Sequence, residues 1–268
     1  MSPIAKHSQN MLKYRIMSEL KIANDKLNSI RFSADTLKII AIIAMLIDHF
    51  SYGVLHAYLL NNAMSILPQT YTKLNNLYNY GRNIGRLSMP IFAFFLVEGF
   101  LRTSNLKRYI LRMLIFALAS EIPFDLGLYN SYWYIEHQNI LFTFVIGLIM
   151  LSTIRYLNRT ILGLSDAVKA FAIICCVIAY ADLSYILKCD YNVKCIIVIA
   201  ILYFLRECKP IKLLAGAAAL SWEKFAPISF LLLYFYDPDK SRKLKYFFYV
   251  FYPAHFILIF IVSKMVMA

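Results

Sequence analysis

The sequence is poor in acidic residues and lacks the short motifs that identify many soluble enzymes. It has 15 aspartates and glutamates against 28 lysines and arginines, which gives a formal net charge of +13. It contains no glycine-rich phosphate loop, internal repeat or low-complexity tract. The five cysteines lack the spacing of metal ligands, so we expect no metal site. Cys189 and Cys195 are either small buried thiols or a pair that meets across a turn.

Long apolar runs dominate what is present. The chain is 60% hydrophobic with a mean hydropathy of +0.60, whereas soluble domains are usually about 45–50% apolar. Several runs reach the roughly 20 apolar residues that a membrane-spanning helix needs. Because the basic residues fall between these runs, their excess is explained by a membrane rather than by nucleic acid. The sequence therefore predicts an all-α, polytopic transmembrane bundle.

We expect about nine spans, within a range of eight to ten. The seventh and eighth runs are short, and they are either two crossings or a broken, re-entrant pair. The expected spans are 37–60, 85–101, 109–129, 138–157, 168–187, 193–206, 211–222, 225–236 and 246–266.

The basic residues also predict the orientation. With the amino terminus inside, 21 of the 28 lysines and arginines lie in the inner segments 1–38, 102–112, 155–169, 206–212 and 237–245. This asymmetry follows the positive-inside rule and predicts a multi-pass membrane protein with a cytoplasmic amino terminus. We expect no cleavable signal sequence. Residues 1–36 are either a basic amphipathic helix on the membrane surface or a partly disordered tail, and residues 37–268 form one membrane domain.

Ionisable residues inside the apolar runs are the candidate functional groups, because each costs roughly 2.5–3.5 kcal/mol at mid-membrane on insertion scales. They are Asp48, His49, Glu98, Glu121, Asp125 and His255. At a rise of 1.5 Å per residue, His49 lies about 18 Å beyond Leu37, past the middle of a core about 30 Å thick. Glu121 and His255 lie at similar heights, so these polar groups converge in the outer half of the membrane.

Each of these residues also has a purely structural interpretation. His255 is either a hydrogen bond between helices or part of the site. Glu121 and Asp125 flank Pro123, and they either bond backbone groups that the proline frees or pair with Arg86. Asp48 and His49 point about 100° apart on a helix and need not touch. Glu98 lies near the inner end of its span, within reach of the two arginines Arg102 and Arg112.

Five stretches resemble the TraX family, the conjugative F-pilin acetylase and its relatives. They are "LKIIAIIAMLIDH" (37–49), "GRLSMPIFAFFLVEGF" (85–100), "RYILRMLIFALASEIPFD" (108–125), "NILFTFVIGL" (139–148) and "YFFYVFYPAHFILI" (246–259). The polar residues embedded in these stretches make the set specific, since apolar runs alone resemble one another. The chain departs from the family pattern at Asn192, where we expect glycine, and its basic segment 1–36 and outer loop 61–84 are long.

The resemblance implies a multi-pass protein of the bacterial inner membrane that transfers acetyl from acetyl-CoA. In related membrane acyltransferases a histidine on an early span takes part in acyl transfer, and in the type member the acceptor is the amino terminus of pilin. Carried over to this chain, the family's polar positions are Asp48, His49, Arg86, Glu98, Glu121, Asp125, Asn139 and His255.

Acyl transfer needs a base, donors for the developing oxyanion, and a site for CoA. His49 is the candidate base, and a carboxylate of Asp48, Glu121 or Asp125 is expected to orient it. Arg86, Asn139 and His255 are candidate contacts for the oxyanion or the acceptor. The inner basic residues are candidates for holding acetyl-CoA: Arg102, Lys107, Arg108, Arg112, Arg155 and Arg159.

Two other classes of function stay open. Mid-membrane acids and histidines also serve proton-coupled carriers, and a non-catalytic part of a pilus or conjugation apparatus is a third possibility. The expected partners are the lipid bilayer, acetyl-CoA, and an acceptor such as pilin or a surface glycan, with no nucleic acid. Binding of acetyl-CoA separates the enzyme from the other two classes.

The charge asymmetry yields a test of orientation. A reporter fused after Arg159 or at Lys240 should be cytoplasmic, and one placed near Tyr71 should be outside. Labelling of both kinds of site from the same side of the membrane contradicts the predicted topology.

Overall fold

The structure is a computed structural model that describes residues 31–160, 163, 165–239 and 247–267. In this part of the chain every regular element is a helix, and the β-structure is limited to two isolated bridges. This confirms the all-helical fold class. The expectation for residues 1–36 falls mostly on residues outside the described ranges.

The first long helix contains a π-helical segment near its carboxyl end. It consists of α2 (Ala34–Phe50), the π-helix η1 (Ser51–His56) and α3 (Ala57–Asn61). The Ser33 side chain caps α2 by accepting a hydrogen bond from the Thr36 N–H at 3.0 Å. Single π turns inside α-helices are frequent at functional sites, and this one begins two residues after His49.

The segment expected as the outer loop 61–84 is helical instead. Helix α4 (Pro68–Gly85) begins with a proline in its first turn, where no hydrogen bond is lost. It packs along α2 and η1 and continues, after a break at Arg86 and Leu87, into α5 (Ser88–Arg102). The loop was predicted from the polar residues of this segment, but one face of α4 packs against α2.

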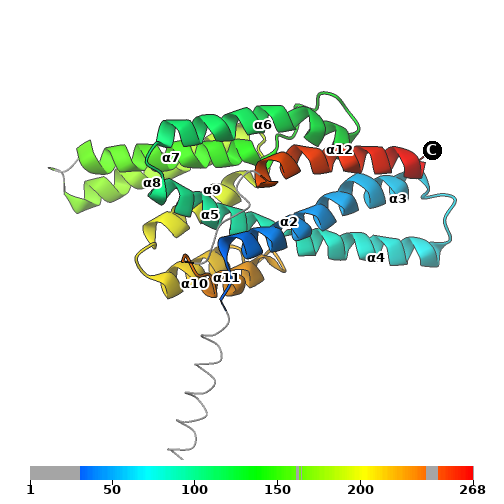
Figure 1. Cartoon of the computed structure of the whole chain (residues 1–268), viewed down its shortest axis with the longest axis horizontal. Coiled ribbons are helices and arrows are strands. Elements are labelled where there is room, and N and C mark those ends of the chain that lie inside the picture. The colour runs from blue at the N-terminus through cyan, green and yellow to red at the C-terminus, as the bar shows by residue number, and fades with distance from the viewer. Residues whose placement is uncertain (1–30, 161–162, 164, 240–246, 268) are drawn as a thin grey trace, which may run out of the picture.

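Seven further helices complete the fold of the described residues. They are α6 (Leu106–Tyr129), α7 (Ile140–Thr160), α8 (Asp166–Ile186), α9 (Asn192–Phe204), α10 (Lys209–Ala219), α11 (Ala226–Tyr234) and α12 (Phe247–Met267). In Figure 1 the ends of α3 and α12 and the start of α4 lie at one end of the molecule, and the far ends of α7 and α8 lie at the other. The segment before α2 is tied to the end of α11, where the Phe32 N–H donates to the Phe235 carbonyl at 2.9 Å.

Among the described residues, five helices are long and apolar enough to cross a membrane: 34–61, 68–102, 140–160, 166–186 and 247–267. With its family, described below, this makes the chain a multi-pass membrane protein. Helices α10 and α11, with 11 and 9 residues, are too short to cross a core of about 30 Å at 1.5 Å per residue. They pack against each other, which favours the re-entrant alternative for this pair. The count of nine spans stays a prediction.

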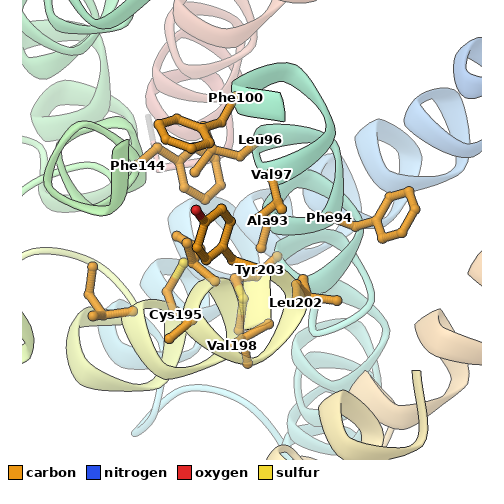
Figure 2. Packing of buried hydrophobic residues seen from close by; sticks show 14 of the residues in the cluster. Ala93, Phe94, Leu96, Val97, Phe100, Phe144, Cys195, Val198, Leu202 and Tyr203 are labelled. Carbon is orange, nitrogen blue, oxygen red and sulfur yellow. The ribbon is translucent and has the colours of Figure 1, made fainter. Parts of the chain in front are cut away.

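Helix α5 lies at the centre of the bundle. Its core residues pack between α7 and α9, and Figure 2 shows Phe100 of α5 beside Tyr203 of α9, whose ring centroids are 5.8 Å apart. By contrast, α8 buries only Ala181 and Ser184. An apolar helix with so little burial has a face left for lipid, whereas α5 is enclosed by protein on most sides.

Glycines bring helices from three parts of the chain into close contact beside His49. A side chain added at Gly53 would meet the carbonyl oxygen of Gly127, and one added at Gly127 would lie 2.7 Å from the carbonyl oxygen of Phe256. Small residues at helix contacts in membranes let backbones approach in this way. The contact joins η1, α6 and α12, and His49 lies on the helix that leads into η1.

Replacing Gly127 should therefore destabilise the protein. Gly127→Val forces the α6 backbone away from Phe256, and we expect a loss of about 1–3 kcal/mol, measured by thermal unfolding in detergent. The control is Gly163→Val, because nothing lies within 4 Å of a side chain added there. Equal stability of the two variants would show that the close contact is not needed.

Candidate active site

A cavity of about 400 Å³ lies between α2, α5, α6 and the first turns of α7 and α12. At one end it is lined by Asp35, Lys38 and Arg112, and at the other by Asp48 and His49. Lys38 and His49 are eleven residues apart on one helix, so the two ends are separated by about 16 Å. The wall between them is largely aromatic and includes Phe92, Phe95, Phe116, Phe248 and Tyr249.

His49 is hydrogen-bonded to the second histidine predicted for the site. Its Nδ1 lies 2.8 Å from Nε2 of His255, and Nδ1 of His255 lies 3.1 Å from the carbonyl oxygen of Phe251. A carbonyl oxygen only accepts, so we assign the proton of a neutral His255 to Nδ1. Its Nε2 then accepts from Nδ1–H of His49. In this assignment Nε2 of His49 carries a lone pair and is the atom able to take up a proton.

Asp48 faces a different helix from His49. Its Oδ2 accepts from Nη1 of Arg82 at 2.8 Å and lies 4.0 Å from Nε2 of His49. Oδ1 is buried and has no hydrogen-bond partner among the described residues. Helix α4 approaches closely because Gly85 lies directly against the Asp48 side chain. The partner of Asp48 is thus Arg82, not Arg86.

Arg86, the second arginine of this segment, is held by Glu223 and Tyr191. Its Nε lies 3.3 Å from Oε2 of Glu223, and its guanidinium lies over the ring of Tyr191 at 5.4 Å from the centroid. Tyr191 itself lines the cavity beside Asp48 and His49, whereas Arg86 does not.

The acids of α6 contact neither His49 nor Arg86, contrary to the expectation from the sequence. Glu121 accepts hydrogen bonds from both the backbone and the side-chain amide of Asn139, and Asp125 accepts from the Tyr134 N–H at 2.8 Å. The Asn139 amide also donates to the Ala117 carbonyl at 2.9 Å, and its oxygen accepts from the Leu141 N–H at 3.0 Å. Glu121, Asp125 and Asn139 hold the loop between α6 and α7. The catalytic role predicted for Glu121 and Asp125 has no contact that supports it.

One of the arginines predicted to hold the donor lines the cavity. Arg112 does so, while Arg102 pairs with Glu98 at 3.0 Å, as the sequence suggested. Arg155 instead lies over the Phe100 ring at 4.0 Å from its centroid. Arg108 lies in the first turn of α6, where its N–H is capped by Asn105 at 3.0 Å. Arg108 and Arg155 do not line the cavity.

The polar residues that line the cavity without having been predicted as site residues include Lys38, Asp190 and Tyr191. At the end of the cavity away from His49, Nζ of Lys38 lies 5.1 Å from the ring centroids of both Phe95 and Phe248. Tyr191 has a φ of 54°, which is rare for a bulky residue and often marks a functional site. In the sequence, the departure from the family pattern at Asn192, directly after Asp190 and Tyr191, was the feature that could have pointed to this turn.

Asp190, which lies outside the expected spans, connects the loop between α6 and α7 with the turn between α8 and α9. Its Oδ1 lies 3.4 Å from Nε2 of His137, and this hydrogen bond raises the pKa of the His137 imidazole. The Thr143 hydroxyl donates to the Asp190 carbonyl at 2.6 Å. Together these contacts fix the turn that presents Tyr191 to the cavity.

Among the described residues, no group of three or more histidines, cysteines or acids is placed to hold a metal ion. All five cysteines are free thiols, and Cys189 and Cys195 are buried, which agrees with the first of the two alternatives for this pair.

Comparisons with known proteins agree on one family. The family model described as "TraX protein" matches residues 33–263. A curated relative, the probable fimbrial assembly protein FimC, serogroup H1, of Dichelobacter nodosus, is 30% identical over 261 residues, covering 86% of this chain and 96% of the relative. No solved structure matches the chain.

Breaking the Asp48–Arg82 pair should lower the free energy of unfolding. Arg82→Ala leaves a buried carboxylate without its partner, and the loss should approach the roughly 3–5 kcal/mol of a broken buried pair. It should stay below that range because the Arg82 side chain is 26% exposed. Asp48→Asn should restore part of the loss in the Arg82→Ala background, as measured by thermal unfolding in detergent.

The matched control for this pair is Arg206→Ala. Arg206 pairs with the largely exposed Glu207 at 3.1 Å, so its loss should change stability little. An Arg82→Ala variant as stable as Arg206→Ala would contradict the importance of the buried pair.

Proposed function

Because this chain belongs to the TraX family, we propose that it is a membrane acetyltransferase that moves an acetyl group from acetyl-CoA to an amine or hydroxyl acceptor. The name of its curated relative favours a role for the proposed reaction in the assembly of fimbriae. The observation that carries the proposal is the cavity that begins beside Lys38 and Arg112 and ends at His49.

The cavity has the properties that a CoA thioester requires. Two cations, Lys38 and Arg112, line one end together with the acids Asp35 and Glu98, and Glu98 is already paired with Arg102 at 3.0 Å. Lys38 and Arg112 are the groups proposed to contact the CoA phosphates. The aromatic wall suits the long, narrow pantetheine arm. In the proposed orientation this end faces the cytoplasm, where acetyl-CoA is made. Acetyl-CoA supplies the activated acetyl group, and the about 16 Å of helix between Lys38 and His49 separates the anchor from the reacting end.

His49 is proposed as the general base. Its Nε2 takes the proton from the acceptor N–H or O–H as the acceptor attacks the thioester carbonyl, and later returns it to the leaving sulfur. His255 is a positioning residue, because the hydrogen bond at 2.8 Å fixes which ring nitrogen of His49 is free. Asp48 Oδ2, 4.0 Å from Nε2, stabilises the imidazolium that forms.

Tyr191 is a better candidate for the oxyanion donor than Asn139 or Arg86. Both N–H groups of the Asn139 amide are already used, by Ala117 and Glu121. Arg86 lies outside the cavity, with its guanidinium over the Tyr191 ring at 5.4 Å from the centroid. Tyr191 lines the cavity, and its phenolic O–H is the donor proposed for the oxyanion.

The test measures acetyl-CoA binding and acetyl transfer separately in purified protein. His49→Ala should bind acetyl-CoA like the parent, since the donor is anchored at the other end of the cavity. Transfer should fall by about 10²–10⁴-fold, the usual contribution of a positioned base. Binding is followed by calorimetry and transfer by release of free CoA thiol.

A matched control lies on the same continuous helix. His56 stacks against Tyr52 and Tyr78, with ring centroids 5.5 and 5.0 Å away, and does not line the cavity. His56→Ala should keep both binding and transfer. A parent protein that does not bind acetyl-CoA would overturn the proposed function, and a fully active His49→Ala variant would overturn the assignment of the base.

A further inference from the structure

A second polar space lies beyond the Asp48–Arg82 pair. It is a groove of about 760 Å³ between α4 and the turn that precedes α11, which we call the α4 groove. The residues that matter for its chemistry are Asn76, Asn79, Asn83, Arg82, Arg86 and Lys224. Arg82 belongs to this groove and its partner Asp48 belongs to the cavity, so the ion pair is the wall between the two spaces.

The groove face of α4 carries a row of asparagine amides. Asn76, Asn79 and Asn83 follow i, i+3, i+7 spacing and share one face, with Arg86 one turn further on. Asparagine is unfavourable in helix interiors, so these three residues lower the stability of α4. No hydrogen bond joins these three amides to other groups in the described part of the chain, and each offers both donors and an acceptor.

The charges of the groove are mostly neutralised, and what remains is positive. Arg82 is paired with Asp48 at 2.8 Å, and Arg86 with Glu223 at 3.3 Å. Glu223, the one acid among the groove residues, also accepts from Lys194 at 2.6 Å. Lys224 adds a further positive charge. Such a surface disfavours an incoming ammonium group, whereas the neutral amides match the paired donor and acceptor of a hydroxyl.

We propose that the α4 groove binds the acceptor and that the acceptor is a hydroxyl group on a polar chain of the carbohydrate class. This inference rests on the proposed function and specifies its substrate. Aromatic side chains complete the site: Tyr78 and Tyr80 lie among the groove residues, Tyr78 with one ring face stacked on His56 and Tyr80 exposed. Rings of this kind offer an apolar face beside a polar hydroxyl.

The reaction then forms an ester. The acceptor oxygen bonds to the acetyl carbon, its proton passes to Nε2 of His49, and the carbon–sulfur bond breaks. The sulfur leaves as thiolate and takes the proton from His49, so free CoA thiol and an O-acetyl product result. The acceptor meets the cavity only past Arg82 and Asp48, which places this pair beside the reacting hydroxyl.

The chemistry of the product tests the acceptor class while the acceptor itself is still unidentified. Membranes from cells that make the protein, and from cells that lack it, are incubated with radiolabelled acetyl-CoA. Label that depends on the protein should resist protease and be released by alkaline hydroxylamine, which cleaves esters but not amides. Label in a protease-sensitive, hydroxylamine-stable product would overturn the hydroxyl acceptor. The absence of protein-dependent label would instead overturn the proposed function itself.

Variants test the groove. Replacing Asn79 and Asn83 together by alanine should lower labelling of the acceptor at least tenfold while leaving acetyl-CoA binding unchanged. Asn75 lies on the same helix outside the groove, so Asn75→Ala should label like the parent. Parent-like labelling by the double variant, with normal amounts of folded protein, would show that the acceptor binds elsewhere.

Discussion

The buried ion pair between Asp48 and Arg82 is the interaction on which the site depends. Taking an unpaired carboxylate out of water costs several kcal/mol, so α4 has to bring Arg82 into the bundle for Asp48 to be tolerated there. Gly81 and Gly85 permit that approach, because side chains added at these positions would meet Ser51 and Asp48. The polar helix α4 therefore belongs to the membrane fold, although its composition is typical of a loop.

Composition and local spacing predicted the helices, because apolar run length and capping depend on neighbouring residues. The membrane class, the helical fold and the Glu98–Arg102 pair were all accessible in this way. The helical state of 68–85 was missed because the residues that it packs against α2 include Gly81, Gly85 and Arg82, which carry no hydrophobic signal. The sequence also showed that the runs of α10 and α11 are short, but it left two crossings and a re-entrant pair open, and the observed lengths and mutual packing favour the pair.

Within the site, residue types were predictable but partners were not. His49 and His255 were both candidates, yet their 206-residue separation leaves no local trace of the hydrogen bond between them. The same holds for Asp48 and Arg82, 34 residues apart. Glu121 was a candidate from its depth and from the family resemblance, and Asn139 from the resemblance, whereas the two residues bind each other and fix a loop. Depth therefore identifies buried polar groups without distinguishing those that face a cavity from those that join helices.

The π-helical segment that follows His49 brings its helix into contact with α4, α6 and α12. Its extra residue per turn changes the direction of the side chains that follow, so that Gly53 meets α6 and α12 while Ser51 meets α4. Asp48 and His49 precede this segment, and as adjacent residues of an α-helix they point about 100° apart. They are therefore bound from different sides, one by Arg82 and the other by His255. Because each side chain is held by its own partner helix, the lone pair on Nε2 of His49 and the carboxylate of Asp48 keep a fixed separation of 4.0 Å. Asp48 and His49 therefore bind residues of two different helices. Because they are adjacent in the sequence, both lie at the boundary between the cavity and the α4 groove.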